Sequence, residues 1–262
     1  MRRLVVLLLA LLPVLVAGPT PSPAAAAAAP EPLPLPVGVR ADYQLGGVRD
    51  VPDDVGIVVR DRHAEPAGVY DVCYVNGFQT QPDEQAFWKG HPRLVLRRHG
   101  RPVVDSAWGE QLLDLRTAAR RAALARIVAR WTAQCARDGY EAVELDNLDS
   151  WTRSRGLLTA TQATAYARAL VRDAHAVGLA VAQKNRAGWD GRTVGFDFAV
   201  AEECGRYREC AAYAEDYGRR VVAVEYRAQD LSWTCAHHGD LAVVLRDVDV
   251  TPDGVRRWCP QP

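Results

Sequence analysis

Short apolar segments alternate with helical patterns along most of this chain, and this alternation restricts the fold more than any other feature. Segments rich in aliphatic and β-branched side chains are typical of buried strands, and amphipathic segments separate several of them. The candidate strands are 55–60, 70–75, 94–97 or 112–115, 142–146, 179–184, 196–202, 221–226 and 241–246. Eight strands in this order predict an α/β fold, a (β/α)8 TIM barrel.

Two predicted helices flank the candidate strand 142–146. The first spans 117–139, has an apolar stripe at helical spacing and ends at a glycine. The second spans 159–178, opens with a Thr-x-x-Gln capping box and also ends at a glycine. A strand between two such helices has the βαβ order that a parallel sheet requires.

The beginning of the predicted barrel departs from this regular order. Only residues 61–68 separate the first two candidate strands. A parallel crossover through a helix normally needs more residues than this segment provides. We therefore expect the first βα unit either to lack its helix or to be irregular.

Acidic residues are concentrated on the candidate strand 142–146 and directly after it. Because side chains alternate along a strand, Glu144 and Asp146 share one face while apolar neighbours share the other. Glu144 lies within the apolar segment, where a buried carboxylate is costly without a partner or a function. Acids at the carboxyl end of a barrel strand lie on the rim that holds catalytic groups in barrel enzymes. A calcium loop or a solvated turn is the simpler alternative.

Polar side chains also end most of the other candidate strands. The carboxyl ends of parallel strands meet at one rim, so we expect these groups to line a common cleft. Each one alone has a plainer interpretation, because a strand usually ends in something polar. The residues are Asp61, Asn76, Lys184, Asn185, Glu202, Glu203, Glu225 and Asp247.

Two carboxylates that face each other across a cleft are typical of glycoside hydrolases. One protonates the leaving oxygen, and the other attacks the sugar or activates water. Asp146 and a glutamate of the turn 201–204 are the predicted pair. A metal site is the competing interpretation, with Glu144, Asp146 and Asp149 as oxygen ligands. We find no zinc-type histidine spacing, phosphate loop or serine nucleophile elbow, and we expect no cofactor.

Residues 1–30 have the pattern of a signal peptide, with two arginines, an apolar run and a stretch of proline and alanine. The apolar run is short for a membrane span, so we expect a secreted, extracellular protein without a membrane partner. The segment 31–36 is interpreted as a Pro-rich linker. The folded domain is then expected over 37–262, a length that suits one barrel.

The charge balance argues against a nucleic-acid partner. Without the signal peptide, 30 basic residues stand against 32 acidic ones, whereas nucleic-acid binding usually needs a basic excess or patch. Nothing in the sequence indicates a protein partner, and we expect a monomer.

Six cysteines in an exported chain favour disulfides. Spacing suggests two pairs, Cys204 with Cys210 and Cys235 with Cys259. Cys73 and Cys135 remain, and they are interpreted either as a bond between a strand and a helix or as two buried thiols.

Four segments together resemble a known family. They are 139–149, 174–185, 196–204 and 224–226. Their residues and their order are similar to those of the endo-α-1,4-polygalactosaminidase-like enzymes, glycoside hydrolase family 114. This resemblance implies a TIM barrel that hydrolyses α-linked, galactosamine-containing polysaccharide within the chain. It also implies that the two catalytic carboxylates are Asp146 and Glu202.

Other residues near this pair are expected to bind the substrate or to tune the pKa values of the two acids. They are Tyr74, Glu144, Asp149, Trp151, Lys184, Asn185, Glu203 and Glu225. Trp151 is predicted either to stack on a sugar or to serve as a lid or core residue. An amino-sugar polymer is cationic, so an acidic rim would concentrate it. The segment 75–81 replaces a Trp-Arg loop of the family, which leaves a non-catalytic carbohydrate-binding barrel as the alternative.

Two arguments disagree on which glutamate opposes Asp146. If Phe196, Phe198 and Val200 pack under helices, strict alternation places Glu203 inside the barrel. The family motif instead selects Glu202, and a bulge at the end of the strand would reverse the alternation. We favour Glu202, because alternation is least dependable at the last residue of a strand.

Overall fold

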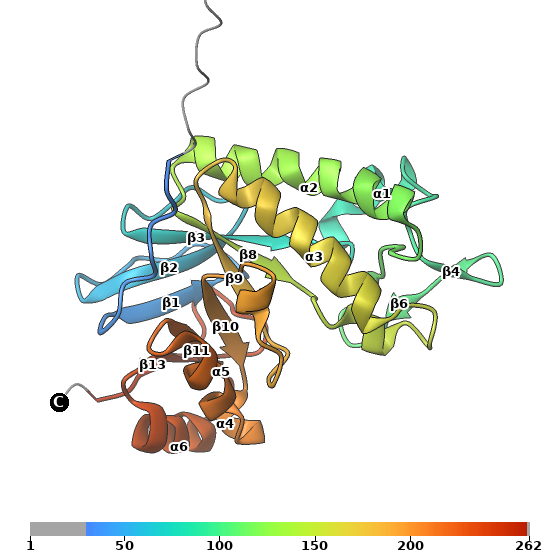
Figure 1. Cartoon of the computed structure of the whole chain (residues 1–262). Helices are drawn as coiled ribbons and strands as arrows, with labels where there is room; N and C mark the ends of the chain where they lie inside the picture. The colour runs from blue at the N-terminus through green and yellow to red at the C-terminus, as the bar shows by residue number, and fades with distance from the viewer. Residues whose placement is uncertain (1–29, 261–262) are drawn as a thin grey trace, which may run out of the picture.

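Eight parallel strands form the wall of a barrel (Figure 1). They are β1 (Arg40–Gln44), β2 (Val55–Asp61), β3 (Tyr70–Asn76), β8 (Ala142–Asp146), β9 (Ala180–Lys184), β10 (Phe198–Glu202), β11 (Val221–Glu225) and β12 (Ala242–Arg246). A short strand, β13 (Arg256–Trp258), pairs antiparallel with β12. This nearly closed barrel confirms the predicted α/β, TIM-barrel class.

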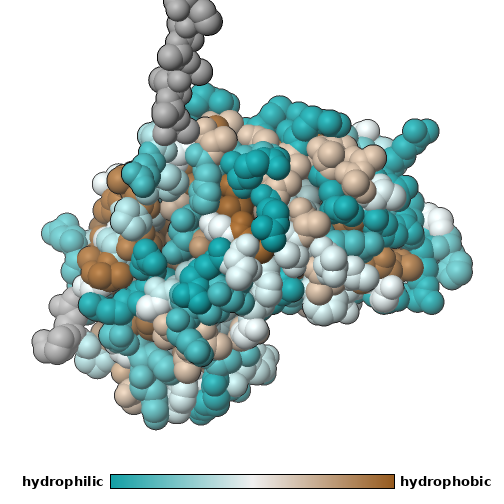
Figure 2. Space-filling model, in the orientation of Figure 1, coloured by the Kyte–Doolittle hydropathy of each residue, from teal (hydrophilic) through white to brown (hydrophobic). Residues whose placement is uncertain are grey.

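The computed structural model describes residues 30–260, so the predicted signal peptide lies outside the described residues. Within this range, none of the helices combines the length and the apolar character that a membrane crossing requires. Hydrophilic residues cover most of the face shown in Figure 2, and hydrophobic ones occur there in small groups.

The two predicted helices form where the sequence places them. They are α2 (Ala118–Asp138) and α3 (Ala160–His175), which pack against each other. The Thr117 side chain caps α2, and Gly139 ends it with a left-handed φ of 98°. The predicted capping box at the start of α3 is also present. Three further helices, α4 (Cys204–Tyr207), α5 (Cys210–Tyr217) and α6 (Ala228–His238), lie beside strands β10 to β12.

The predicted strand at 94–97 or 112–115 is wrong, because neither segment belongs to the barrel. The missing barrel strand is β1, which is too polar to form an apolar run, since Asp42 and Gln44 alternate with its inward-facing residues. The expected irregular beginning is confirmed: among the described residues, no helix lies between β1 and β2 or between β2 and β3.

A long insertion separates β3 from α2 and carries the segments mistaken for a barrel strand. Figure 1 shows it projecting beside the start of α3. It contains η1 (Pro82–Glu84), α1 (Gln85–Lys89) and two small hairpins, β4 (Arg97–Arg98) with β5 (Arg101–Pro102) and β6 (Val104–Asp105) with β7 (Glu110–Gln111). Two other short helices, η2 (Ser150–Arg153) and η3 (Gly191–Thr193), follow β8 and β9.

Side chains and the backbone hydrogen bond from the Gly46 N–H to the Val250 carbonyl oxygen, at 3.2 Å, close the barrel between its first and last strands. Within residues 30–260, no backbone ladder joins β1 to β12 or to β13. The Trp258 indole N–H donates to the Ala41 carbonyl oxygen at 2.7 Å, and Arg256 pairs with Asp42 at 2.6 Å. Asp42 also lies 3.5 Å from Arg246, and both of these side chains are fully buried. We call this group of contacts the seam.

The segment 31–36 does not behave as a free linker. Leu35 is only 3% exposed and belongs to the apolar cluster inside the barrel. The Tyr70 hydroxyl donates to the Leu33 carbonyl oxygen at 2.7 Å. The folded part of the chain therefore begins before Val37, because burial of Leu35 makes this segment part of the barrel core.

All six cysteines are bonded, and the two pairs suggested by spacing are confirmed. Cys73 of β3 and Cys135 of α2 form the third bond, which settles the alternative of two buried thiols. The bond joins the barrel wall to the helix that covers it.

Candidate active site

Three neighbouring strands each end in a charged residue that faces the barrel interior. They are β8, β9 and β10, and their last residues are Asp146, Lys184 and Glu202. The inward position follows from alternation, because apolar residues two positions earlier on β9 and β10 belong to the cluster inside the barrel. The site therefore lies at the carboxyl ends of the strands, where barrel enzymes hold their catalytic groups.

The residue after each of these three positions adopts a left-handed backbone conformation. Asn147, Asn185 and Glu203 have φ values of 69°, 52° and 56°. Asparagine tolerates this region well, whereas glutamate rarely adopts it. The turn ends each strand directly after its charged residue and leaves that side chain at the rim.

The Lys184 ammonium lies between three carboxylates. Its Nζ is 2.8 Å from Glu144 Oε1, 3.3 Å from Glu202 Oε2 and 3.6 Å from Asp146 Oδ1. Lys184 is only 2% exposed. Burial alone would lower its pKa, but the three carboxylates raise the pKa well above its ordinary value. Lys184 is therefore charged and holds the acids together.

Hydrogen-bond donors orient the two predicted catalytic acids. The Tyr74 hydroxyl donates to Asp146 Oδ2 at 2.8 Å. Glu202 accepts from the Tyr226 hydroxyl and, at 3.1 Å, from the Asn185 amide. These contacts restrict both carboxyl groups, as positioned catalytic groups require. Among the predicted substrate-binding residues, Tyr74 and Asn185 therefore lie at the acid pair.

The two acids have different proton affinities. Burial raises the pKa of Asp146, and the neighbouring Lys184 offsets only part of this effect. Burial would also raise the pKa of Glu202, but Lys184 and the hydrogen bonds from Tyr226 and Asn185 lower it below the ordinary value. The surroundings therefore favour the protonated form of Asp146 and the ionised form of Glu202. Environments that separate the pKa values of two neighbouring acids are typical of acid–base pairs in enzymes.

Glu144 lies beneath the pair and is fully buried. Its Oε1 accepts hydrogen bonds from the Tyr43 hydroxyl at 2.7 Å and from Lys184 at 2.8 Å. Burial raises the pKa of Glu144 to about 7. Of the two roles expected for Glu144, its position suits tuning of the acid pair rather than contact with substrate, because the side chain has no exposed surface and contacts Lys184.

Glu203 lies outside the barrel, so the parity argument fails. Phe198 and Val200 belong to the cluster inside the barrel, which places Glu202 on the inner face without any bulge. The large residues fill the interior, and the small alanines between them pack under the helices, opposite to the assumption behind that argument. The Glu203 carboxylate pairs with Arg206 at 2.5 Å, away from Lys184.

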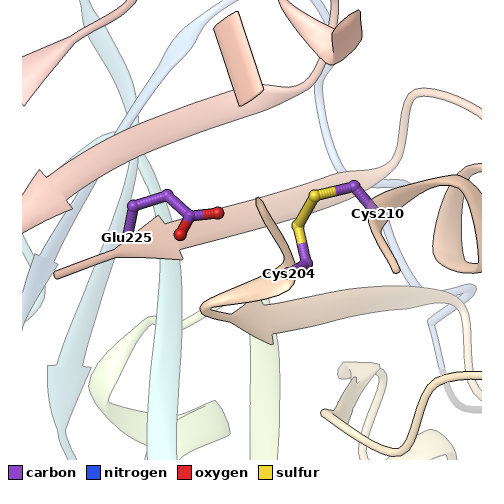
Figure 3. Close-up of side chains that lie close together, drawn as sticks. All are labelled: Cys204, Cys210 and Glu225. Atoms are coloured by element: carbon purple, nitrogen blue, oxygen red, sulfur yellow. A yellow bond between two sulfur atoms is a disulfide. The ribbon is translucent and has the colours of Figure 1, made fainter. Parts of the chain in front are cut away.

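Glu225 also points away from the predicted cleft. It is fully buried and accepts hydrogen bonds from the Gly205 N–H at 2.7 Å and the Thr234 hydroxyl at 3.0 Å. Figure 3 shows it beside the disulfide of Cys204 and Cys210. Glu225 therefore fixes the start of α4 against α6, and the structure does not bring it together with Asp146 and Glu202. The bonded sulfurs offer no thiolate, so this cluster lacks the ligands of a zinc site.

The alternative metal site does not assemble either. Glu144 and Asp146 both face the Lys184 ammonium, and Asp149 pairs with Arg153 at 3.0 Å. A fixed cation already lies between the first two proposed ligands, and the third is directed elsewhere.

Trp151, on η2, is partly buried against the apolar cluster outside the barrel. This contact suits the core alternative for Trp151 better than the stacking one.

Sequence reasoning missed two acids on the insertion. Glu110 lies on β7 and Asp105 on β6; both are largely buried, and Glu110 lies near both Asp146 and Asp105. Asp105 pairs with Arg153 at 2.6 Å, whereas Glu110 accepts from the Asn76 amide at 2.9 Å. For Glu110 the only signal in the sequence is an acid just before the apolar segment 112–115, one of the two alternatives for a barrel strand.

Replacing Lys184 by methionine is expected to lower the free energy of unfolding by about 3 kcal/mol at neutral pH, because buried carboxylates lose their counter-ion. The loss should shrink as pH falls: without the ammonium the carboxyl pKa values rise further in the folded state, and protonation then favours folding. Urea unfolding at several pH values measures this. Lys89, the only other lysine and an exposed one, provides the matched control, Lys89→Met. Equal stability of the two variants would contradict the prediction.

A nearly closed parallel barrel with two inward carboxyl groups at its carboxyl rim is typical of barrel glycoside hydrolases. The model of glycoside-hydrolase family GH114 matches residues 21–262. The chain therefore belongs to family GH114, as its four motifs predict. A search of curated protein sequences gives no match to this chain.

Solved structures share the fold at low sequence identity. Ega3 of Aspergillus fumigatus, solved in complex with galactosamine, superimposes with a TM-score of 0.69 and 19% identity, over 88% of this chain and 100% of that one. The glycoside hydrolase domain of PelA from Pseudomonas aeruginosa gives a TM-score of 0.55 and 17% identity, over 82% of this chain and 97% of that one. These similarities concern the barrel as a whole.

Proposed function

We propose that this protein is a secreted hydrolase that cleaves α-linked, galactosamine-containing polysaccharide within the chain. The observation that carries the proposal is the pair Asp146 and Glu202, held on either side of the Lys184 ammonium at the carboxyl rim. Family membership supports a glycosidic bond as the target. Three disulfides suit an extracellular protein, because such bonds persist in oxidising compartments.

In the proposed reaction, one acid of the pair protonates the leaving glycosidic oxygen, and the other attacks the anomeric carbon or activates water. Asp146 is the better proton holder in the free protein, and Glu202 is the better anion. Lys184 stabilises whichever carboxyl group is ionised. Tyr74 and Tyr226 keep the two groups oriented while a proton moves.

The charge of the site supports a cationic substrate. Three carboxyl groups surround Lys184, those of Glu144, Asp146 and Glu202, and a fourth, that of Glu110, lies near Asp146. A polymer of free amino sugars carries positive charge, and an acidic cleft raises its local concentration. Galactosamine is the sugar bound in the Ega3 structure, which agrees with this choice.

Incubation with a galactosaminogalactan tests the proposal through the appearance of new reducing ends. We expect large oligosaccharides first, because cleavage within a chain shortens it before single sugars accumulate. Activity should persist in EDTA, since the proposed mechanism needs no metal. Asp146→Asn serves as the inactive control. Binding of the polymer without any new reducing ends would instead support the alternative, a carbohydrate-binding barrel.

A further inference from the structure

The β6–β7 hairpin brings a third carboxyl group to the rim. Glu110 Oε2 accepts from the Asn76 amide at 2.9 Å and from the Asn147 amide at 3.5 Å. Asn76 ends β3 in register with Asp146, and Asn147 directly follows Asp146. Glu110 is only 8% exposed. It therefore lies beside the catalytic pair, although the insertion contributes it.

Glu110 has no ion-pair partner among residues 30–260. The nearby guanidinium of Arg153 pairs with Asp105 at 2.6 Å and with Asp149 at 3.0 Å. Burial raises the pKa of Glu110 to about 7, and the charges of Asp146 and Asp105 add to this effect. A buried carboxylate without a cation is costly, and such groups are normally paired.

The Glu110 carboxyl group acts as a hydrogen-bond acceptor in both of its contacts with the neighbouring amides. Both amide groups direct their N–H donors at Oε2, an arrangement that favours the ionised carboxylate. Burial and neighbouring acids oppose the same charge. An external cation placed beside Glu110 would resolve this conflict, because it would supply the missing partner.

We propose that Glu110 binds the ammonium group of a hexosamine unit and makes the site select free-amine sugars over N-acetylated ones. This inference rests on the proposed function and adds the group that distinguishes the two sugars. An ammonium offers three donors and a positive charge to the carboxylate. An N-acetyl group offers one neutral donor and more bulk, so it gains little from Glu110.

The test compares cleavage of a de-N-acetylated polymer with cleavage of its N-acetylated form. We expect Glu110→Gln to lower the preference for the free-amine polymer, measured as the ratio of kcat/KM values, by at least about tenfold, the usual size of a lost charged hydrogen bond. The loss should appear in KM, because Glu110 binds substrate without moving a proton in the reaction. Glu215→Gln, an exposed acid on α5, is the matched control and should keep the preference of the parent.

The pH dependence gives a second readout. Because the bound ammonium favours the ionised form of Glu110, KM for the free-amine polymer should fall as pH rises from about 5 to about 7. The dependence should be weaker in Glu110→Gln. Asp146 on β8, Asp105 on β6 and Arg153 on η2 also face Glu110, and all remain in the variant.

The outcomes separate this inference from the proposed function. Inactivity of the parent on both polymers would overturn both. An active parent whose preference is unchanged in Glu110→Gln would overturn the inference alone. Equal losses on both polymers would also overturn it, because they indicate a structural role. If Glu110→Gln fails to fold, Glu110→Asp provides a second variant, which keeps the charge on a shorter side chain. It should raise KM for the free-amine polymer more than KM for the N-acetylated polymer.

Discussion

Replacing Asp146 by asparagine is expected to abolish cleavage, with a fall of at least about a hundredfold in kcat, while the fold and substrate binding stay nearly intact. Asparagine has the same shape as aspartate and still accepts a hydrogen bond from Tyr74, but it cannot exchange a proton or attack the sugar. Release of reducing ends gives kcat, and binding of oligosaccharide to the variant gives the affinity.

A measurement of the stability of the variant distinguishes loss of the catalytic group from loss of the fold. The Asp146→Asn variant should unfold close to the wild-type midpoint, because Lys184 keeps Glu144 and Glu202 as partners. Cleavage within a few fold of wild type would remove Asp146 from the mechanism. An inactive variant that also loses its fold would require a second substitution, such as Asp146→Glu, to separate the two effects.

Replacing Glu202 by glutamine should cause a loss of similar size, at least about a hundredfold. Glu202 is the other carboxyl group beside Lys184, and its pKa lies below the ordinary value, so it is the anion of the pair. Glutamine keeps the contact with Asn185 but carries no charge.

The neighbouring residue provides a matched control. Glu203→Gln makes the same chemical change one position later, on a side chain that pairs with Arg206 away from Lys184. We expect this variant to keep substantial activity. An inactive Glu203→Gln beside an active Glu202→Gln would show that the second catalytic acid had been assigned one residue early.

Much of the fold follows from local sequence. Helices α2 and α3 have their own capping signals, and strands β8 to β12 are apolar enough to stand out, so both were predicted nearly in place. Strand β1 was missed because Asp42 and Gln44 make it polar, and those residues are buried only because distant arginines reach them. Partners far away in the chain leave no local pattern.

Some features of the candidate site could likewise be predicted from the sequence, and others could not. Asp146, Lys184 and Glu202 end predicted strands, so their convergence follows from the parallel order alone. Whether Glu202 or Glu203 faces inward depends on which residues fill a narrow barrel. Phe198 and Val200 fill it here, which no periodicity reveals. Glu110 reaches the site through an insertion whose path depends on tertiary contacts, so only the structure locates it.

The seam is the one place where the ring of barrel strands described here is not joined by a backbone ladder. A ladder on every side would close the ring with many backbone hydrogen bonds, whereas here the gap is held by a few side chains and by the backbone hydrogen bond from the Gly46 N–H to the Val250 carbonyl oxygen, at 3.2 Å. Strand β1, on one lip of the gap, also carries Tyr43, whose hydroxyl contacts both Glu144 and Lys184. The strand at the edge of the gap therefore also holds the lysine that lies between the two acids, so the closure of the barrel and the alignment of its carboxyl groups depend on the same strand.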